Sequence, residues 1–438
     1  MSVKSLEVNL NNVPSSSKIS FSGGIPTISF TISAQNALLN LSSIRLCGRL
    51  HHWANSAGTA VPASDLAPTL MASEKLGVYG TMSQLVWRHS RSKQVIENIS
   101  HYAEFLGSGY LPVQSSEQDS QSHLGETALI VPSYQQFQNS VIRNDESGSS
   151  FCIPLISGLT MGTGTLNLME SAFGGLDCEI HLQPNSQYFF SNTGVDTAIR
   201  DCFYEFQDLK VLCEVYVPEI DELSRLMKET DDVFEFNSIN SYMTTLQSSN
   251  SIVNFQLGLS RVISSYTAFI PSSFVNNLNN NGYAFYLPTK ADTDKSVADI
   301  NDVSFLKMGE RFPFQFVIDA NVKDSPDTNV CDPQIIKYFA DALIPENQHL
   351  RTSMSPITTN RGYSAKPAVI NKVPSGGAIY AVGCNYDKLN SDGVNFKNQS
   401  FTVQMSTGLN DGNPVSAYLF VKAKNTIAWN ANGIQVTS

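Results

Sequence analysis

The chain has 438 residues and a mass of 47.9 kDa, and only 15% of its residues are charged. One hydrophobic core rarely grows to this length, so two domains are expected. The 28 Lys and Arg against 39 Asp and Glu give a net charge of −11. No basic cluster occurs, which argues against direct sequence-specific nucleic-acid binding. A polar but weakly charged surface favours packing against neighbouring copies.

The cysteines and the apolar runs indicate the compartment. Seven cysteines are scattered without a C-x-x-C pair: Cys47, Cys152, Cys178, Cys202, Cys213, Cys331 and Cys384. This pattern favours free, mostly buried thiols in a reducing compartment over disulfides or a metal site. The N-terminus lacks the apolar core of a signal peptide, and no apolar run approaches the ~18 residues of a membrane span. We therefore expect a soluble protein that is assembled inside a cell and not secreted by a signal peptide.

Alternating apolar residues predict strands through the first half of the chain, at residues 6–10, 28–32, 44–50, 180–182 and 209–217. A helix is predicted within SKQVIENISHYAEFLG (92–107). Its buried stripe would be Val95, Ile99, Tyr102 and Leu106, and Gly107 would end it.

A second helix, PEIDELSRLMKE, follows the strand at 209–217 directly. Pro218 suits a first helical position, and Ile220, Leu223 and Met227 share one face. We place the domain boundary just after this helix. Residues 1–231 would then form the first domain with its connecting helix, and residues 232–438 the second.

The second half repeats the pattern, with strands predicted at residues 234–236, 253–257, 266–270 and 312–318. A helix is predicted at 332–343, with Asp332 as its N-cap and Pro333 at its first position. The chain ends in a hairpin at 415–438, with Asn432-Gly433 as a tight primed turn.

Long polar loops separate these segments, at residues 114–127, 276–282 and 289–302. About eight strands per half, joined by long crossing loops, fit a jelly roll better than an up-and-down barrel. The predicted fold class is all-β: two tandem eight-stranded jelly rolls with a short helix in each.

Candidate chemical sites are weak. Gly162-Thr163-Gly164 lacks the third glycine of a dinucleotide fingerprint and predicts a flexible connection. Zinc needs three or four converging ligands, which these histidine motifs do not supply: His51-His52-Trp53, His101 with Glu104, and His123 with Glu126. They are better interpreted as polar residues at strand ends or in loops.

The carboxylates also have ordinary interpretations. Those near the boundary helix offset its dipole: Glu219, Asp221, Glu222, Asp231 and Asp232. The run Asp292, Asp294, Asp299 and Asp302 lacks the glycine and the bidentate glutamate of an EF-hand. We predict no catalytic residue, no cofactor-binding residue, no metal ligand and no cofactor.

Four segments, in this order, resemble a known family. They are SQLVWRHSRSKQVIENISHYAEFL, with Glu97 and Tyr102 on its helix; DCEIHLQPNSQYFF followed by FQDLKVLCEVYVPEID; NFQLGLSRVISSYTAFIPSSF; and AYLFVKAKNTIAWNANGIQVTS. Together they resemble the double jelly-roll viral major capsid proteins of virophages, polinton-like viruses, tailless membrane-containing phages and adenovirus hexons. The chain has no room for the long tower insertions of hexons.

The resemblance implies a non-enzymatic structural protein. Three chains would form a homotrimeric, pseudo-hexagonal capsomer that self-assembles into an icosahedral virus shell. Its partners would be neighbouring capsomers, penton and minor capsid proteins, and an internal membrane reached through other proteins; its location would be the virion.

Two alternatives remain at this stage. A two-domain β-sandwich carbohydrate-binding protein, lectin-like or fibre-like, would show clustered exposed aromatic residues. A jelly-roll carbohydrate-active enzyme would need two carboxylates facing each other across a cleft.

Overall fold

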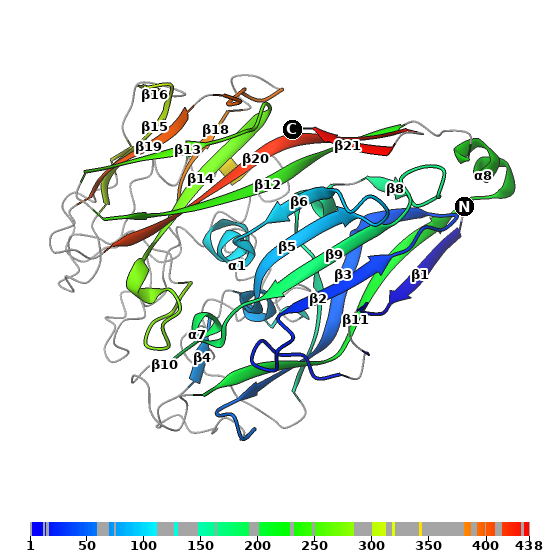
Figure 1. The fold of residues 1–438 in the computed structure, drawn as a ribbon, viewed down its shortest axis with the longest axis horizontal. Helices are drawn as coiled ribbons and strands as arrows, with labels where there is room; N and C mark the ends of the chain where they lie inside the picture. The colour runs from blue at the N-terminus through cyan, green and yellow to red at the C-terminus, as the bar shows by residue number, and fades with distance from the viewer. Residues whose placement is uncertain are drawn as a thin grey trace.

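Two β-sandwiches lie side by side in the computed structural model of the chain (Figure 1). The structure describes residues 2–11, 14, 17–58, 70–73, 76–111, 127–129, 148–162, 164–191, 201–227, 232–247, 250–283, 300–311, 318–319, 341–343, 381–386, 392–398, 400–407, 414–430 and 433–437. We name the part built from β1 to β11 the first sandwich, and the part built from β12 to β21 the second sandwich.

The first sandwich has two antiparallel sheets. One sheet has the order β1 (Ser2–Val8), β11 (Phe203–Val217), β3 (Leu38–Trp53) and β7 (Ser149–Pro154), with β8 (Thr165–Asn167) also paired to β3. The other has the order β2 (Thr27–Ile32), β9 (Leu176–Leu182), β5 (Met82–His89) and β6 (Val95–Ile99). A small ribbon pairs β10 (Phe189–Ser191) with β4 (Leu70–Ala72).

The second sandwich is built in the same way. One sheet has the order β12 (Asp232–Leu246), β20 (Val415–Asn430), β14 (Val262–Pro271) and β18 (Ala381–Asn385), with β21 (Gly433–Thr437) also paired to β20. The other has the order β13 (Asn250–Gln256), β19 (Ser400–Thr407), β15 (Ile300–Lys307) and β16 (Glu310–Arg311), with β17 (Ile318–Asp319) paired to β15.

Strand order is the same in both sandwiches. In each, the first strand pairs with the long closing strand, which also pairs with the third: β1-β11-β3 corresponds to β12-β20-β14. The second strand opens the opposite sheet, as β2-β9-β5 corresponds to β13-β19-β15. A chain that alternates between two packed sheets in this way follows a Greek-key path, whose doubled form is a jelly roll.

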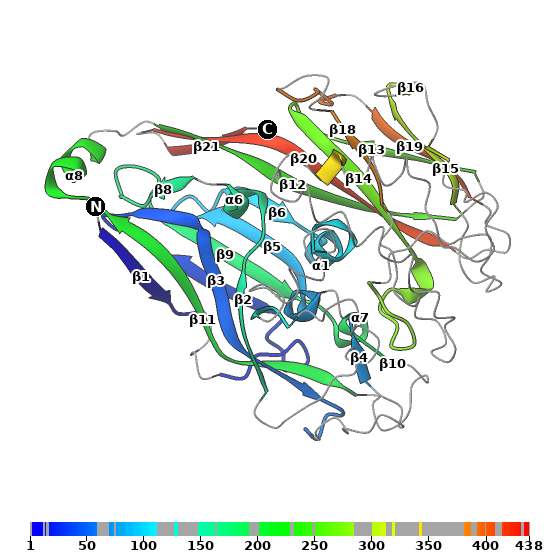
Figure 2. The same ribbon diagram turned by 180° about the vertical axis from the view of Figure 1, so that it is seen from behind.

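The short helices lie in the connections between strands. They are η1 (Gly77–Thr81), α1 (Tyr102–Phe105), which continues as the π-helix η2 (Leu106–Tyr110), α6 (Gly158–Met161), α7 (Asn185–Tyr188), α8 (Ile220–Leu226) and η4 (Ser272–Phe274). In both views α1 lies between β5 of the first sandwich and β14 of the second (Figures 1 and 2). No helix in the described part of the chain has the length and apolar character needed to cross a membrane.

The two sandwiches share a continuous apolar contact. One cluster of buried side chains includes the core of the first sandwich and also Tyr266, Ala268, Phe420 and Trp429 of the second. A separate cluster fills the space between the two sheets of the second sandwich. The sheet that contains β14 is therefore covered on both faces, which explains why all ten residues of β14 are buried.

The first predicted helix was placed wrongly at its start. Residues 95–99 form strand β6, which pairs with β5, and the helix begins only at Tyr102. The β-branched residues Val95, Ile96 and Ile99 favour an extended chain when a partner strand is present. Nor does Gly107 end the helix, because it lies inside η2, buried against Leu76.

The second predicted helix exists as α8, but its predicted buried stripe is wrong. Ile220 is 81% exposed and Met227 is 44% exposed, whereas Leu226 is buried. The helix lies at the edge of the molecule beside the N-terminus (Figures 1 and 2).

Other predictions concern the end of the chain and the loops. The closing hairpin is confirmed, since β20 pairs with β21 from Asn430 opposite Gly433. The predicted turn is wrong in its position, because Gly433 is the first residue of β21 and not a turn residue. Of the helix predicted at 332–343, residues 341–343 are helical and the rest lie outside the described residues, as do Asn432 and most of the loops at 114–127 and 289–302.

Candidate functional site

A buried carboxylate lies where the two sandwiches meet. Glu97 of β6 is 3% exposed, and it accepts hydrogen bonds from the backbone N–H groups of Gly158 (3.0 Å), Leu159 (3.0 Å) and Ile239 (2.7 Å). Gly158 and Leu159 open α6 of the first sandwich, whereas Ile239 belongs to β12 of the second. One carboxylate therefore connects three elements across the contact.

The segment that leads into α6 presents these N–H groups. Ser157 Oγ accepts from the Thr160 N–H (3.3 Å), and Thr160 Oγ1 accepts from the Ser157 N–H (2.9 Å). This capping box starts the helix, whose first N–H groups have no intrahelical acceptor and turn to Glu97 instead. Gly158 is required here, because a Cβ would lie 1.8 Å from the carbonyl oxygen of Asn237 on β12.

Burial and hydrogen bonding act on Glu97 in opposite directions. Burial raises the pKa of Glu97 to about 7, although the N–H groups of Ile239, Leu159 and Gly158 favour the ionised form. Ile239 belongs to β12, an outermost strand of its sheet in the described order, so its N–H would otherwise be an unpaired donor at a buried edge. Glu97 thus supplies the acceptor for a backbone N–H group at the edge of this sheet.

A second buried carboxylate, Glu104 of α1, is 5% exposed. Gln183 Nε2 donates to its Oε1 (3.3 Å), whereas its Oε2 has no partner among the described residues. Burial raises the pKa of Glu104 to about 7. Glu104 also lies close to two tyrosines of the second sandwich, Tyr283 and Tyr418. Burial raises the pKa of both hydroxyls, and the nearby Glu104 charge raises it further.

Aromatic rings fill the space around α1 on the side of the second sandwich. The rings of Phe105 and Phe420 lie 5.7 Å apart, and the Tyr266 hydroxyl donates to the Phe105 carbonyl oxygen (3.1 Å). His101, just before α1, meets Tyr418 edge to face at 5.1 Å, and burial lowers the pKa of His101.

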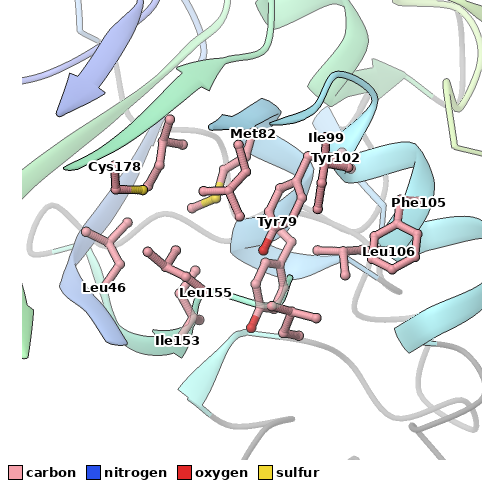
Figure 3. Close-up of a cluster of buried hydrophobic side chains, with 14 of the residues drawn as sticks. Leu46, Tyr79, Met82, Ile99, Tyr102, Phe105, Leu106, Ile153, Leu155 and Cys178 are labelled. Carbon is pink, nitrogen blue, oxygen red and sulfur yellow. The ribbon is translucent and has the colours of Figure 1, made fainter. Parts of the chain in front are cut away.

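The opposite side of the same helix belongs to the first core. Figure 3 shows Tyr102 and Leu106 packed with Tyr79, Met82 and Ile99. The short helix therefore links the two sandwiches by burying both of its sides, which is why a single apolar stripe did not predict its position.

A groove of about 480 Å³ opens beside this contact, between the α6 segment and the start of β12. It is lined by Gly158, Met161, Gly162, Gly164, Phe234, Glu235, Phe236, Asn237 and Lys424. Its two charged residues have opposite signs, and Glu235 is already paired with Arg261 (3.1 Å). Within the described ranges no group of three His, Cys, Asp or Glu side chains is placed to hold a metal ion.

The histidine motif at residues 51–53 lies at the end of β3, as predicted for strand-end residues. His52 Nε2 lies 2.9 Å from the Tyr188 hydroxyl, and burial, followed by the proximity of His51, lowers the pKa of His52 to about 3. His51 stacks on Trp53 with ring centroids 6.0 Å apart. These contacts are those of packed residues of the sandwich.

The other candidates are dispersed. Glu219 occupies the N-cap position of α8, with Asp221 and Glu222 in its first turn, where they offset the helix dipole as predicted. Gly162 follows α6 directly and Gly164 precedes β8 directly, so both lie in a connection between elements, as predicted. The remaining candidates lie outside the described residues: His123, Glu126, Asp231, Asp292, Asp294 and Asp299.

Sequence reasoning missed the role of Glu97, because it placed this residue on a helix. A signal was present. Glu97 lies between Ile96 and Ile99, which are both buried on β6, and a buried carboxylate needs several donors.

No family model and no curated protein matches the sequence. Solved structures do match over the whole chain. The major capsid protein of mavirus aligns with a TM-score of 0.53 at 9% identity, covering 99% of this chain and 90% of that one. The Faustovirus major capsid protein gives 0.54 at 8% identity, covering 98% and 90%.

A chain in the cryo-EM structure of the Sputnik virophage aligns with a TM-score of 0.55 at 11% identity, covering 100% of this chain and 88% of that one. These alignments span both sandwiches, and the strand order repeats between the two. The chain has the double jelly-roll fold. The fold implied by the four quoted segments is thereby confirmed.

The double jelly roll corrects one detail of those segments. Glu97 does not share a helix with Tyr102, since it lies on β6, five residues before α1 begins at Tyr102. The carboxylate faces α6 and β12 because the strand, not the helix, runs along the contact.

Proposed function

We propose that the protein is a viral major capsid protein whose activity is self-assembly, without an enzymatic reaction. The observation that carries this proposal is the repeat of one strand order in two sandwiches of a single chain. The aligned mavirus and Faustovirus chains are described as major capsid proteins, which supports the same role here.

The assembly unit is a homotrimer. Three chains with two similar sandwiches each supply six similar wedges around a three-fold axis, which gives a pseudo-hexagonal capsomer with contacts between unlike sandwiches. The low charge of the chain supports this, since neutral polar surfaces cost little to desolvate. We propose residues 1–231 and 232–438 as its two units.

The partners follow from the same role. Neighbouring capsomers would tile an icosahedral shell in the virion, with penton and minor capsid proteins at its vertices and seams. The net charge of −11 and the lack of a basic cluster support genome contact through other components, such as an internal membrane or a basic protein.

Light scattering of the purified full chain, followed by electron microscopy, tests this function. A particle of three times 47.9 kDa with a hexagonal outline is expected. A monomer over the whole accessible concentration range would contradict the proposal. A monomer that binds an immobilised glycan would instead support the carbohydrate-binding alternative.

A further inference from the structure

Two cysteines lie opposite each other on neighbouring strands of the first sandwich. Cys47 of β3 and Cys152 of β7 are register partners, and their Sγ atoms lie 2.7 Å apart. Both are free thiols. A disulfide bond measures about 2.05 Å, so a small rotation of either side chain would bring the two sulfur atoms to bonding distance.

The register of the two strands suits a disulfide. The Leu155 N–H donates to the Ile44 carbonyl oxygen (3.2 Å), so these residues form a hydrogen-bonded pair of the ladder. Hydrogen-bonded and open pairs alternate, which makes Cys47 and Cys152, three positions further along, an open pair. Cα atoms of open pairs lie about 4.5 Å apart, within the range of about 4.4–6.8 Å that disulfides span.

The two thiols differ in access. Cys152 is half-buried on β7, the last strand of its sheet in the described order, whereas Cys47 is 7% exposed on an inner strand. Burial, and then the adjacent Cys152 thiol, raises the pKa of Cys47 to about 12, while the Lys210 and Arg45 charges act in the opposite direction. An oxidant from solution therefore meets Cys152 first, and Cys47 is placed to resolve the product.

We propose that Cys47 and Cys152 form an intramolecular disulfide when the protein meets a low-molecular-weight disulfide such as oxidised glutathione. The Cys152 thiolate attacks one sulfur of the oxidant, which forms a mixed disulfide and releases one glutathione thiolate. Cys47 then loses its proton and attacks the Cys152 sulfur, which displaces the second thiolate. Two protein thiols are oxidised, one oxidised glutathione is reduced to two glutathiones, and the two protons pass to the leaving thiolates.

This site is independent of the proposed capsid role. The bond would join residues 105 positions apart in sequence, so it would constrain the unfolded chain strongly and raise the stability of the first sandwich. A protein made in a reducing compartment would carry the thiols, and the same protein in an oxidising medium would carry the bond.

Peptide mapping of the purified full chain tests the site without any variant. The reduced protein is treated with oxidised glutathione at pH 8, free thiols are blocked, and disulfide-linked peptides are identified by mass spectrometry. A Cys47–Cys152 link within one chain is expected, with the loss of two hydrogen atoms per chain and a melting temperature higher by on the order of 5–10 °C. A protein in which both residues stay alkylated, or carry only glutathione, would refute the proposal.

Two substitutions sharpen the result. Cys47→Ser should trap glutathione on Cys152 and remove the thermal shift, since the resolving thiol is gone. Cys384→Ser is the matched control, a buried thiol of the second sandwich, and should leave the link and the shift unchanged. A shift that persists in Cys47→Ser, or a link between chains, would also contradict the inference.

Discussion

The contribution of Glu104 to the free energy of unfolding should fall as pH rises from 4 to 8. Burial of this carboxyl between the sandwiches favours its protonated form, so the folded protein holds the proton more tightly than the unfolded chain does. The stabilisation is complete below the ordinary value of 4.5 and is lost as pH rises through about 7.

The magnitude follows from these two values. The interval from 4.5 to about 7, at about 1.4 kcal/mol per pH unit, corresponds to about 3–4 kcal/mol of unfolding free energy. Glu104→Gln keeps the shape of the neutral side chain and the hydrogen bond from Gln183 but cannot ionise. The variant should therefore match the wild type at pH 4 and exceed it at pH 8 by about 3 kcal/mol.

Urea denaturation of both proteins at several pH values measures this difference directly. Glu97 and His101 titrate equally in both proteins, so the comparison isolates Glu104. Parallel pH profiles for the wild type and Glu104→Gln would refute the reasoning, because they would show that this carboxyl is ionised, or solvated, throughout the range.

Further predictions concern the contact between the sandwiches and its surroundings. Glu97→Ala leaves three buried N–H donors without an acceptor and should cost at least about 3 kcal/mol in urea denaturation. Gly158→Ala forces a Cβ to within 1.8 Å of a carbonyl oxygen and should cost more than about 3 kcal/mol in the same assay, whereas Gly162→Ala, with open space around it, should be tolerated. Ile220→Ser with Met227→Ser, on the exposed face of α8, should change stability by less than about 0.5 kcal/mol per site. Calorimetry should show a single unfolding transition, because one apolar cluster spans both sandwiches; two resolved transitions would contradict this.

Sequence patterns predicted the strands well and the contact between sandwiches poorly. Period-2 alternation, as in Ile28, Phe30 and Ile32, reports a strand with one buried face, and these residues are buried on β2. Periodicity misled the prediction at residues 95–99, where apolar residues at helical spacing belong to a strand. Periodicity over five residues cannot separate the two structures, and the pairing with β5 that decides between them is not local.

The buried carboxylates were beyond pattern reasoning for a related reason. Glu97 is satisfied by donors 61, 62 and 142 residues away in sequence. A local window shows only a glutamate among apolar residues. The same limit applies to the cysteines. Their wide spacing in the sequence indicated isolated thiols, but the register of β3 and β7 places Cys47 next to Cys152.

The contact between the sandwiches resembles a domain core more than a surface. The sheet of β12, β20, β14 and β18 has a second sheet on one face and the first sandwich on the other, so its strands carry apolar residues on both sides. Separating the sandwiches would expose Tyr266, Phe420 and Trp429 together with the N–H group that Glu97 accepts from. Because that exposure is costly, the chain should behave as one unit with its two sandwiches in a fixed relation. The trimer that we propose requires a fixed relation of this kind, since any hinge between the paired sandwiches would leave the closure of its ring of six sandwiches undefined.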